Sequence, residues 1–153
     1  MNKQKGFTLI ELLVVIAIIG ILSAVVLASL GTARDSGNDA AVKANLSGIR
    51  TQASLYAVNN DNKFGGLCTS TGSGGITLAL NETVKASPAS EFVDGINDVG
   101  DATKVVCHAT ANAWAVAAPL FVGGYWCVDN NGASMKVTET LDSGETECTA
   151  PTI

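Results

Sequence analysis

The sequence predicts an α+β protein in which a long N-terminal helix leads into a small head built on an antiparallel β-sheet. Three patterns support this fold class. Residues 9–30 form an almost uninterrupted apolar run, residues 42–56 carry apolar side chains at helical spacing, and the second half of the chain alternates short Val-rich and aromatic segments with turns. At 153 residues, the chain has room for one domain and an appendage, not for two full domains.

The apolar run from Leu9 to Leu30 is long enough to cross a bilayer of about 30 Å as a helix that rises roughly 1.5 Å per residue. Glu11 is the one charged residue inside it. A carboxylate in hydrocarbon costs roughly 2.5 to 3.5 kcal/mol or more, so Glu11 marks a site whose partner has to be found. The nearest positive charges, Lys3 and Lys5, precede the run and are typical of an anchor on the cytoplasmic side.

A family resemblance suggests a partner for the Glu11 carboxylate, namely the N-terminal amine of a neighbouring chain. The short basic segment ends at Gly6 and is followed by Phe7-Thr8-Leu9-Ile10-Glu11 and the apolar run. Residues 5–27 closely resemble the class III signal of type IV prepilins and pseudopilins, while the head lies outside the resemblance. The resemblance implies cleavage between Gly6 and Phe7 by a prepilin peptidase and methylation of the new Phe7 amine. It also implies that Glu11 is the buried acid that sets subunit register during assembly.

The helix continues beyond the apolar run. Its second half carries one apolar stripe at spacings of four and three residues, formed by Val42, Leu46, Ile49, Ala53 and Tyr56. We expect this stripe to pack on the head and the helix to stop at the turn-forming residues 59–62. The expected organisation is a leader at residues 1–6, a transmembrane and fibre-core helix half at 7–30, a head-packed helix half at 31–59 and a head at 60–153.

Within the head, the sequence predicts strands at residues 104–109, 114–118, 125–129 and 133–138. Residues 129–132, Asp-Asn-Asn-Gly, suit a tight hairpin turn between the last two and lack the spacing of a calcium-binding EF-hand loop. Ser87 followed by Pro88 predicts a short helix that ends near Gly95. The glycine-rich stretch 69–75 has no Gly-Lys-Ser/Thr ending and no clear helix directly after it, so we expect a loop and not a phosphate site.

Four cysteines follow the apolar run, at Cys68, Cys107, Cys127 and Cys148. No Cys-x-x-Cys pair occurs among them and the chain has one histidine, which disfavours zinc. An even number of cysteines in a small exported head predicts two disulfides, and four cysteines can pair in three ways. We favour Cys68 with Cys107 and Cys127 with Cys148, because the second pair would tie the C-terminal tail to a strand.

The charged residues suggest no catalytic or nucleic-acid site. From Cys68 onward the chain has ten acidic residues and three lysines. Such an acidic head disfavours a broad nucleic-acid-binding surface. His108 follows Cys107 directly, so on a strand the two side chains point to opposite faces and cannot act together. Asp94, Asp98 and Asp101 are typical of a solvated loop. We therefore expect no cofactor, no metal and no enzymatic activity.

These features favour a structural function. We expect a precursor that crosses the cytoplasmic membrane once, with its N-terminus inside and its head outside, and that then joins a homo-oligomeric helical filament outside the cell. Its expected partners are further copies of the chain, a prepilin peptidase and a membrane assembly platform. A type IV pilus subunit for adhesion, twitching motility or DNA uptake is the first hypothesis. The alternatives are a pseudopilin of a type II secretion or competence system and a membrane-tethered enzyme or binding module.

Overall fold

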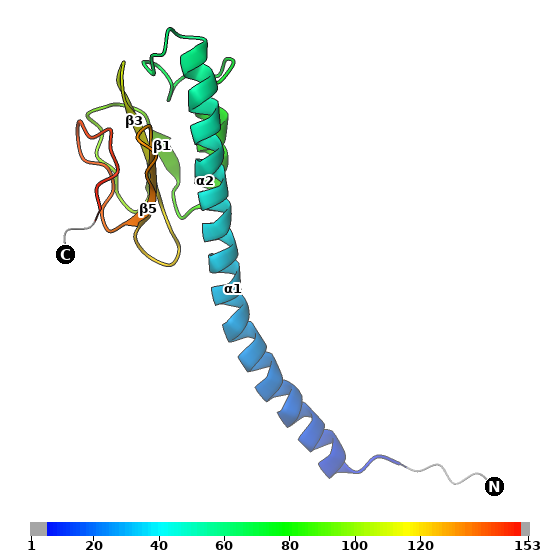
Figure 1. The fold of residues 1–153 in the computed structure, drawn as a ribbon. Helices are drawn as coiled ribbons and strands as arrows, with labels where there is room; N and C mark the ends of the chain where they lie inside the picture. The colour runs from blue at the N-terminus through cyan, green and yellow to red at the C-terminus, as the bar shows by residue number, and fades with distance from the viewer. Residues whose placement is uncertain (1–5, 151–153) are drawn as a thin grey trace. The chain divides into compact units, whose positions relative to one another are not determined.

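The computed structural model describes residues 6–150, and the chain divides into two compact units, residues 1–35 and 36–153. Figure 1 shows the elements, which are α1 (Leu9–Val58), α2 (Thr77–Ala86), β1 (Glu91–Val93), β2 (Lys104–Ala109), β3 (Trp114–Pro119), β4 (Tyr125–Asp129) and β5 (Ser134–Val137). Helix α1 belongs to both units. A long N-terminal helix followed by a mostly antiparallel sheet confirms the predicted fold class.

In the first unit, every side chain from Gly6 to Arg34 is exposed to solvent. Among them are the 16 large apolar residues of positions 7–30, from Phe7 to Leu30. By length and composition this part of α1 could cross a membrane. Since nothing in the described part of the chain covers these side chains, their cover must come from lipid or from another molecule.

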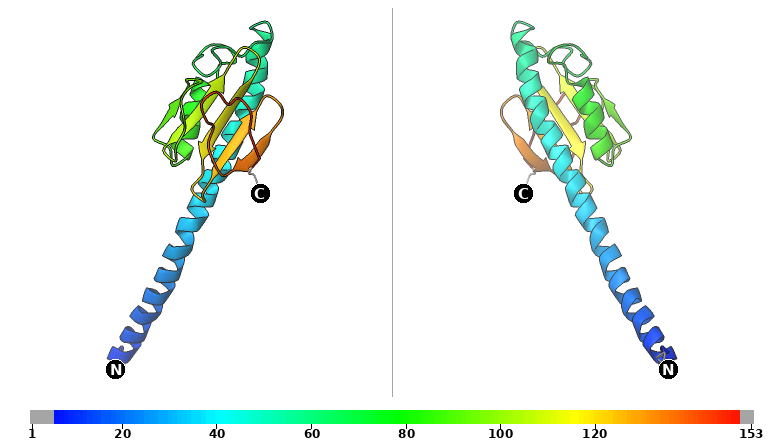
Figure 2. Two further views of the ribbon diagram at one scale, coloured as in Figure 1. Left: turned by 90° about the vertical axis from the view of Figure 1, so that its left-hand side faces the viewer. Right: turned by 90° about the vertical axis from the view of Figure 1, so that its right-hand side faces the viewer.

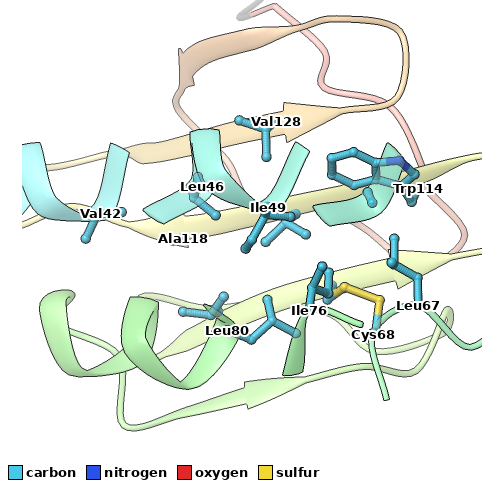
Figure 3. Packing of buried hydrophobic residues seen from close by; sticks show 14 of the residues in the cluster. Val42, Leu46, Ile49, Leu67, Cys68, Ile76, Leu80, Trp114, Ala118 and Val128 are labelled. Atoms are coloured by element: carbon cyan, nitrogen blue, oxygen red, sulfur yellow. A yellow bond between two sulfur atoms is a disulfide. The ribbon is translucent and has the colours of Figure 1, made fainter. Parts of the chain in front are cut away.

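In the second unit, α1 buries one face. The stripe predicted from the sequence is confirmed, because each of its five residues is buried in the helix. All five belong to one core with residues of α2 and of the sheet. Figure 3 shows three of them, Val42, Leu46 and Ile49, together with Leu80, Trp114 and Val128. Fully burying an aliphatic side chain contributes about 1.5 to 3 kcal/mol, so this face holds the second half of α1 on the sheet.

The sheet has the strand order β1-β2-β3-β4-β5. Strands β2 to β5 pair antiparallel in chain order, whereas β1 pairs parallel with β2. The four predicted strands are confirmed to within one residue at each end. The central strand β3 is buried along its whole length, as expected for a strand covered on both faces.

Alternate residues of the strands serve the two faces of the sheet. Val105, Cys107 and Val116 belong to the core beneath the helices, which Figure 2 shows lying on one face. Val106 and Ala117 belong to a second, smaller core with Leu141 and the Cys127–Cys148 pair, on the side of the C-terminal segment. The head is thus a three-layer unit, in which the helices and the C-terminal segment enclose the sheet.

The predicted short helix at residues 87–95 is wrong. The helix of this region is α2, which begins two residues after the glycine-rich loop and ends at Ala86. Ser87 is its C-cap, with φ −106° and ψ 172°, because the residue before a proline is pushed to extended backbone. Residues 91–93 then form β1, since Phe92 and Val93 pair with Val105 and Val106 of β2. The conformation of residues 91–93 therefore depends on pairing with residues of β2, which are more distant in the chain.

The turn between β4 and β5 is organised by Asp129. Its carboxylate is buried and accepts N–H bonds from Asn131 and Ala133 at 2.9 Å each, while Gly132 takes a φ of +100°. The second carboxylate oxygen accepts the N–H of Cys148 at 2.9 Å. The predicted hairpin turn is therefore present, and its aspartate also fixes the C-terminal segment.

Two disulfides cross the head, Cys68–Cys107 and Cys127–Cys148, with Cα atoms 5.9 and 5.8 Å apart. This is the pairing that the sequence favours. The first joins the loop after α1 to strand β2 inside the main core, and the second joins β4 to the tail. The other two pairings are not formed.

A buried acid also connects α1 to the β3–β4 loop. Asp39 is only 5% exposed, and its two carboxylate oxygens accept the N–H groups of Phe121 at 2.7 Å and of Val122 at 3.2 Å. Hydrogen bonds to a charged group contribute about 1.5 to 3 kcal/mol each. Asp39 thus fixes the loop against the helix.

We expect Asp39→Ala to lower the free energy of unfolding of the head by about 2 to 4 kcal/mol, because two N–H groups lose their acceptor. Urea unfolding of the full chain in detergent, followed by tryptophan fluorescence, measures this loss. Asp94→Ala is the matched control, since Asp94 is exposed and its removal should change stability by less than about 0.5 kcal/mol. Equal stability of the two variants would contradict the role of Asp39.

Candidate functional site

The candidate site is the start of α1, where the resemblance places processing and assembly. Gly6 and Phe7 lie in an exposed, non-helical segment directly before the helix. A side chain at position 6 would meet no atom within 4 Å, so the fold itself does not require glycine there. Residues 1–5, including Lys3 and Lys5, lie outside the described residues. Exposed segments without secondary structure are the preferred sites of proteolytic cleavage.

Thr8 and Glu11 form a reciprocal cap at the N-terminus of α1. The Glu11 Oε2 atom accepts the Thr8 N–H at 2.8 Å and the Thr8 hydroxyl at 2.9 Å, and the Glu11 N–H donates to Thr8 Oγ1 at 3.2 Å. The Thr8 carbonyl accepts the first helical bond, from Leu12. This is a capping box, in which residues three apart satisfy each other's free polar groups.

This contact was not predicted, although Thr-x-x-Glu before an apolar run is a signal for it. The consequence is chemical. Among the residues that the structure describes, Glu11 has two hydrogen-bond donors, both from Thr8, and no salt-bridge partner. Both described salt bridges, Lys85–Glu82 and Lys104–Glu91, lie in the head. Within the described residues, the Glu11 carboxylate is therefore positioned by Thr8 and not by an ion pair.

Among the other predicted residues, the four cysteines are brought together as the two disulfides and so carry no reactive thiol. His108 is fully buried, and its ring nitrogens lie 2.7 Å from the Glu145 carbonyl oxygen and 2.8 Å from that of Asp98. These contacts tie two loops to β2. In the part of the chain that the structure describes, no three His, Cys, Asp or Glu residues cluster as metal ligands would.

Asp98 and Asp101, predicted to lie in a solvated loop, order the backbone there. Asp98 accepts the N–H of Gly95 at 2.9 Å. Asp101 accepts both the N–H and the hydroxyl of Thr103, and these bonds hold the pKa of its carboxyl below the usual value. These acids shape the turns that lead into β2.

Comparison with known proteins adds three findings. Residues 1–27 match the family described as the prokaryotic N-terminal methylation motif. Over 120 residues the chain is 34% identical to the type IV wide pilus major component PilA4 of Thermus thermophilus, covering 78% of this chain and 85% of that protein. It is 78% identical over 27 residues to a fimbrial protein of Moraxella nonliquefaciens and to fimbrial protein Q of Moraxella bovis, covering 18% of this chain and 18% and 17% of theirs. No solved structure matches.

Proposed function

Because the chain belongs to the type IV pilin family, we propose that it is a structural subunit of a type IV pilus and has no enzymatic role. Membership of this family implies filament assembly and prepilin peptidase processing from a membrane-anchored precursor. The further step, to a surface fibre that serves adhesion, twitching motility or DNA uptake, is our proposal.

The exposed apolar surface of α1 is the observation that best supports a role as a filament subunit. All 16 large apolar residues between positions 7 and 30 are exposed in the single chain. Lipid can cover them before assembly and the helices of neighbouring subunits afterwards. Each fully buried Leu or Ile contributes about 1.5 to 3 kcal/mol, so helix packing is the main source of adhesion in the fibre. The contact is heterologous and open, which is what a filament requires.

Processing would complete the site at Glu11. Cleavage between Gly6 and Phe7 creates an α-amino group, which is then methylated. The ammonium of Phe7 in one subunit then pairs with the carboxylate of Glu11 in a neighbour. A buried ion pair must first repay its desolvation, so the pair serves register more than net adhesion.

The proposed topology follows from the charges around the helix. Lys3 and Lys5 stay in the cytoplasm, as basic residues beside a membrane helix usually do, and the head lies outside. Two disulfides fit an oxidising compartment. The membrane assembly platform then draws the processed subunit from the bilayer into the fibre.

A pseudopilin of a type II secretion or competence system is the second candidate, because the N-terminal segment is common to both classes. The similarity to a major pilus component over 85% of its length favours the pilus. A membrane-tethered enzyme or binding module would need a reactive cluster in the head, for which the described residues offer no support.

The intact mass of the protein in native cells tests the proposal. We expect filaments sheared from the cell surface to contain a chain that begins at methylated Phe7, with both disulfides intact. The same mass confined to the membrane would favour a pseudopilin or a minor pilin. An unprocessed chain that begins at Met1 in both fractions would contradict the assembly mechanism.

A further inference from the structure

The second unit exposes few large apolar side chains. In the described part of the head and its helix these are Leu55, Val58, Leu78, Val99, Phe121 and Val122. Four of them form two pairs. Leu55 and Val58 lie one turn apart near the end of α1, and we call them the helix-end pair. Phe121 and Val122 are neighbours in the β3–β4 loop, and we call them the apolar tip.

The apolar tip is held in a fixed conformation. Its two N–H groups bind the buried carboxylate of Asp39. The Val122 carbonyl accepts the Lys136 ammonium at 3.3 Å, and the Leu120 N–H donates to the Gly124 carbonyl at 3.0 Å. Gly123 and Gly124 take positive φ angles, which allow this close turn. The fold thus uses a buried charge to hold two apolar side chains in solvent.

A hollow lies beside the apolar tip. It measures about 330 Å³ and is lined mainly by apolar side chains, including Pro88, Pro119, Leu120, Phe121 and Tyr125. Partial burial raises the pKa of the Tyr125 phenol above its usual value, and a tyrosine is in any case uncharged at neutral pH. Burying exposed aliphatic side chains in such a hollow removes apolar surface from water, which favours association.

The hollow and the helix-end pair lie at opposite ends of the same unit. Asp39, which holds the tip, and Val58 are 19 residues apart on one helix, which corresponds to about 28 Å along its axis. Figure 1 shows the β3–β4 loop and the end of α1 at the two ends of the sheet. Two different surfaces at opposite ends of one unit are what an open, heterologous contact between identical copies needs.

We propose that the hollow beside Phe121 receives Leu55 and Val58 of a second copy of this chain, so that heads dock end to end along the fibre. The proposal rests on the proposed function, because filament assembly brings identical heads into repeated order. It assigns a head-to-head contact in addition to the packing of the apolar helices. The joined heads would be offset by about 28 Å along α1, the distance between the two surfaces.

Photo-crosslinking in assembled filaments tests the contact directly. Phe121 is replaced by benzoylphenylalanine, sheared filaments are irradiated, and crosslinked peptides are identified by mass spectrometry. We expect a crosslink to the peptide that contains Leu55 and Val58, and none in detergent-solubilised monomer. Benzoylphenylalanine at Leu78 is the control and should not label that peptide. Filaments that form normally and crosslink position 121 elsewhere, or to lipid alone, would overturn the proposal.

A charge substitution gives an independent measurement. Val58→Glu should reduce the yield of sheared filaments about tenfold or more, because a carboxylate would enter an apolar hollow. Leu78→Glu is the matched control, since Leu78 is 70% exposed and Val58 76%, and its yield should stay unchanged. Equal melting curves of both full-length variants in detergent exclude a folding defect.

The two proposals can fail separately. If the unaltered chain forms no filaments, the proposed function fails and this contact with it. If the unaltered chain forms filaments and Val58→Glu does so equally well, only the head-to-head contact is overturned.

Discussion

Replacing Glu11 by Ala is expected to leave processing intact and to abolish filaments. The variant would still be cut between Gly6 and Phe7, because the cleaved bond lies in the exposed segment before the helix. In the fibre, however, the Phe7 ammonium would have no opposite charge. Leaving one partner of a buried pair uncompensated costs about 3 to 5 kcal/mol, which lowers the association constant per subunit by more than about a hundredfold.

Two further variants separate the charge of Glu11 from its role as a cap. Glu11→Gln keeps an oxygen that can accept both donors of Thr8 but removes the charge, so it should fail to assemble as Glu11→Ala does. Thr8→Ala removes the two bonds of the cap that use the hydroxyl and keeps both the charge and the N–H bond to Glu11. Loss of an N-cap costs about 1 kcal/mol, so this variant should still form filaments.

Cell fractionation with mass spectrometry checks both expectations. The N-terminal mass of each variant reports processing, and the amount in the sheared fraction reports assembly. Filaments of normal length and amount from Glu11→Gln would contradict the role of the ion pair. If Thr8→Ala lost its filaments while Glu11→Gln kept them, assembly would depend on the cap and not on the ion pair.

Removing the Cys68–Cys107 disulfide is the change with the largest expected effect on the head. The bond closes a loop of 39 residues, and loop entropy alone makes it worth about 4 kcal/mol. Both sulfur atoms also lie in the main core, beside Leu67 and Ile76. Since domains of this size have a total stability of about 5 to 15 kcal/mol, Cys68→Ala with Cys107→Ala should remove a large share of the stability of the head.

The second disulfide provides the comparison. Cys127–Cys148 closes a shorter loop of 21 residues, worth about 3 kcal/mol. The bond from the Cys148 N–H to Asp129 remains when the sulfur atoms are gone and still holds the tail. Urea unfolding of the full chain in detergent should therefore show the smaller loss for Cys127→Ala with Cys148→Ala. The reverse order would contradict the placement of the first bond in the main core.

Most of the fold could be predicted because its elements carry local signals. The stripe of Val42, Leu46 and Ile49 predicts a helix face, and the Val-rich segments predict β2 to β5, since the period of apolar residues depends on the residues of each segment alone. The helix α2 has a local signal that was not used. Leu80 and Val84 follow Ile76 at spacings of four residues, and all three belong to or pack against the main core. Strand β1 depends on β2, and its three residues show no pattern of their own.

For the candidate site, the sequence predicted the residues but not their contacts. Gly6, Phe7 and Glu11 follow from the resemblance of the N-terminal segment, and their roles stay proposals. The cap of Thr8 on Glu11 has a known local pattern but was missed. The bonds of Asp39 to the β3–β4 loop could not be predicted, because the partners lie 82 and 83 residues apart and no local pattern links them.

The disulfides also limit how far the head can lengthen under tension. If a fibre subunit were pulled between α1 and its C-terminal end, the loops of 39 and 21 residues could not extend, because each is closed by a covalent bond. At about 3.3 to 3.6 Å per residue, this withholds about 200 Å of chain. An unfolding head could therefore lengthen only through the segments outside the two closed loops.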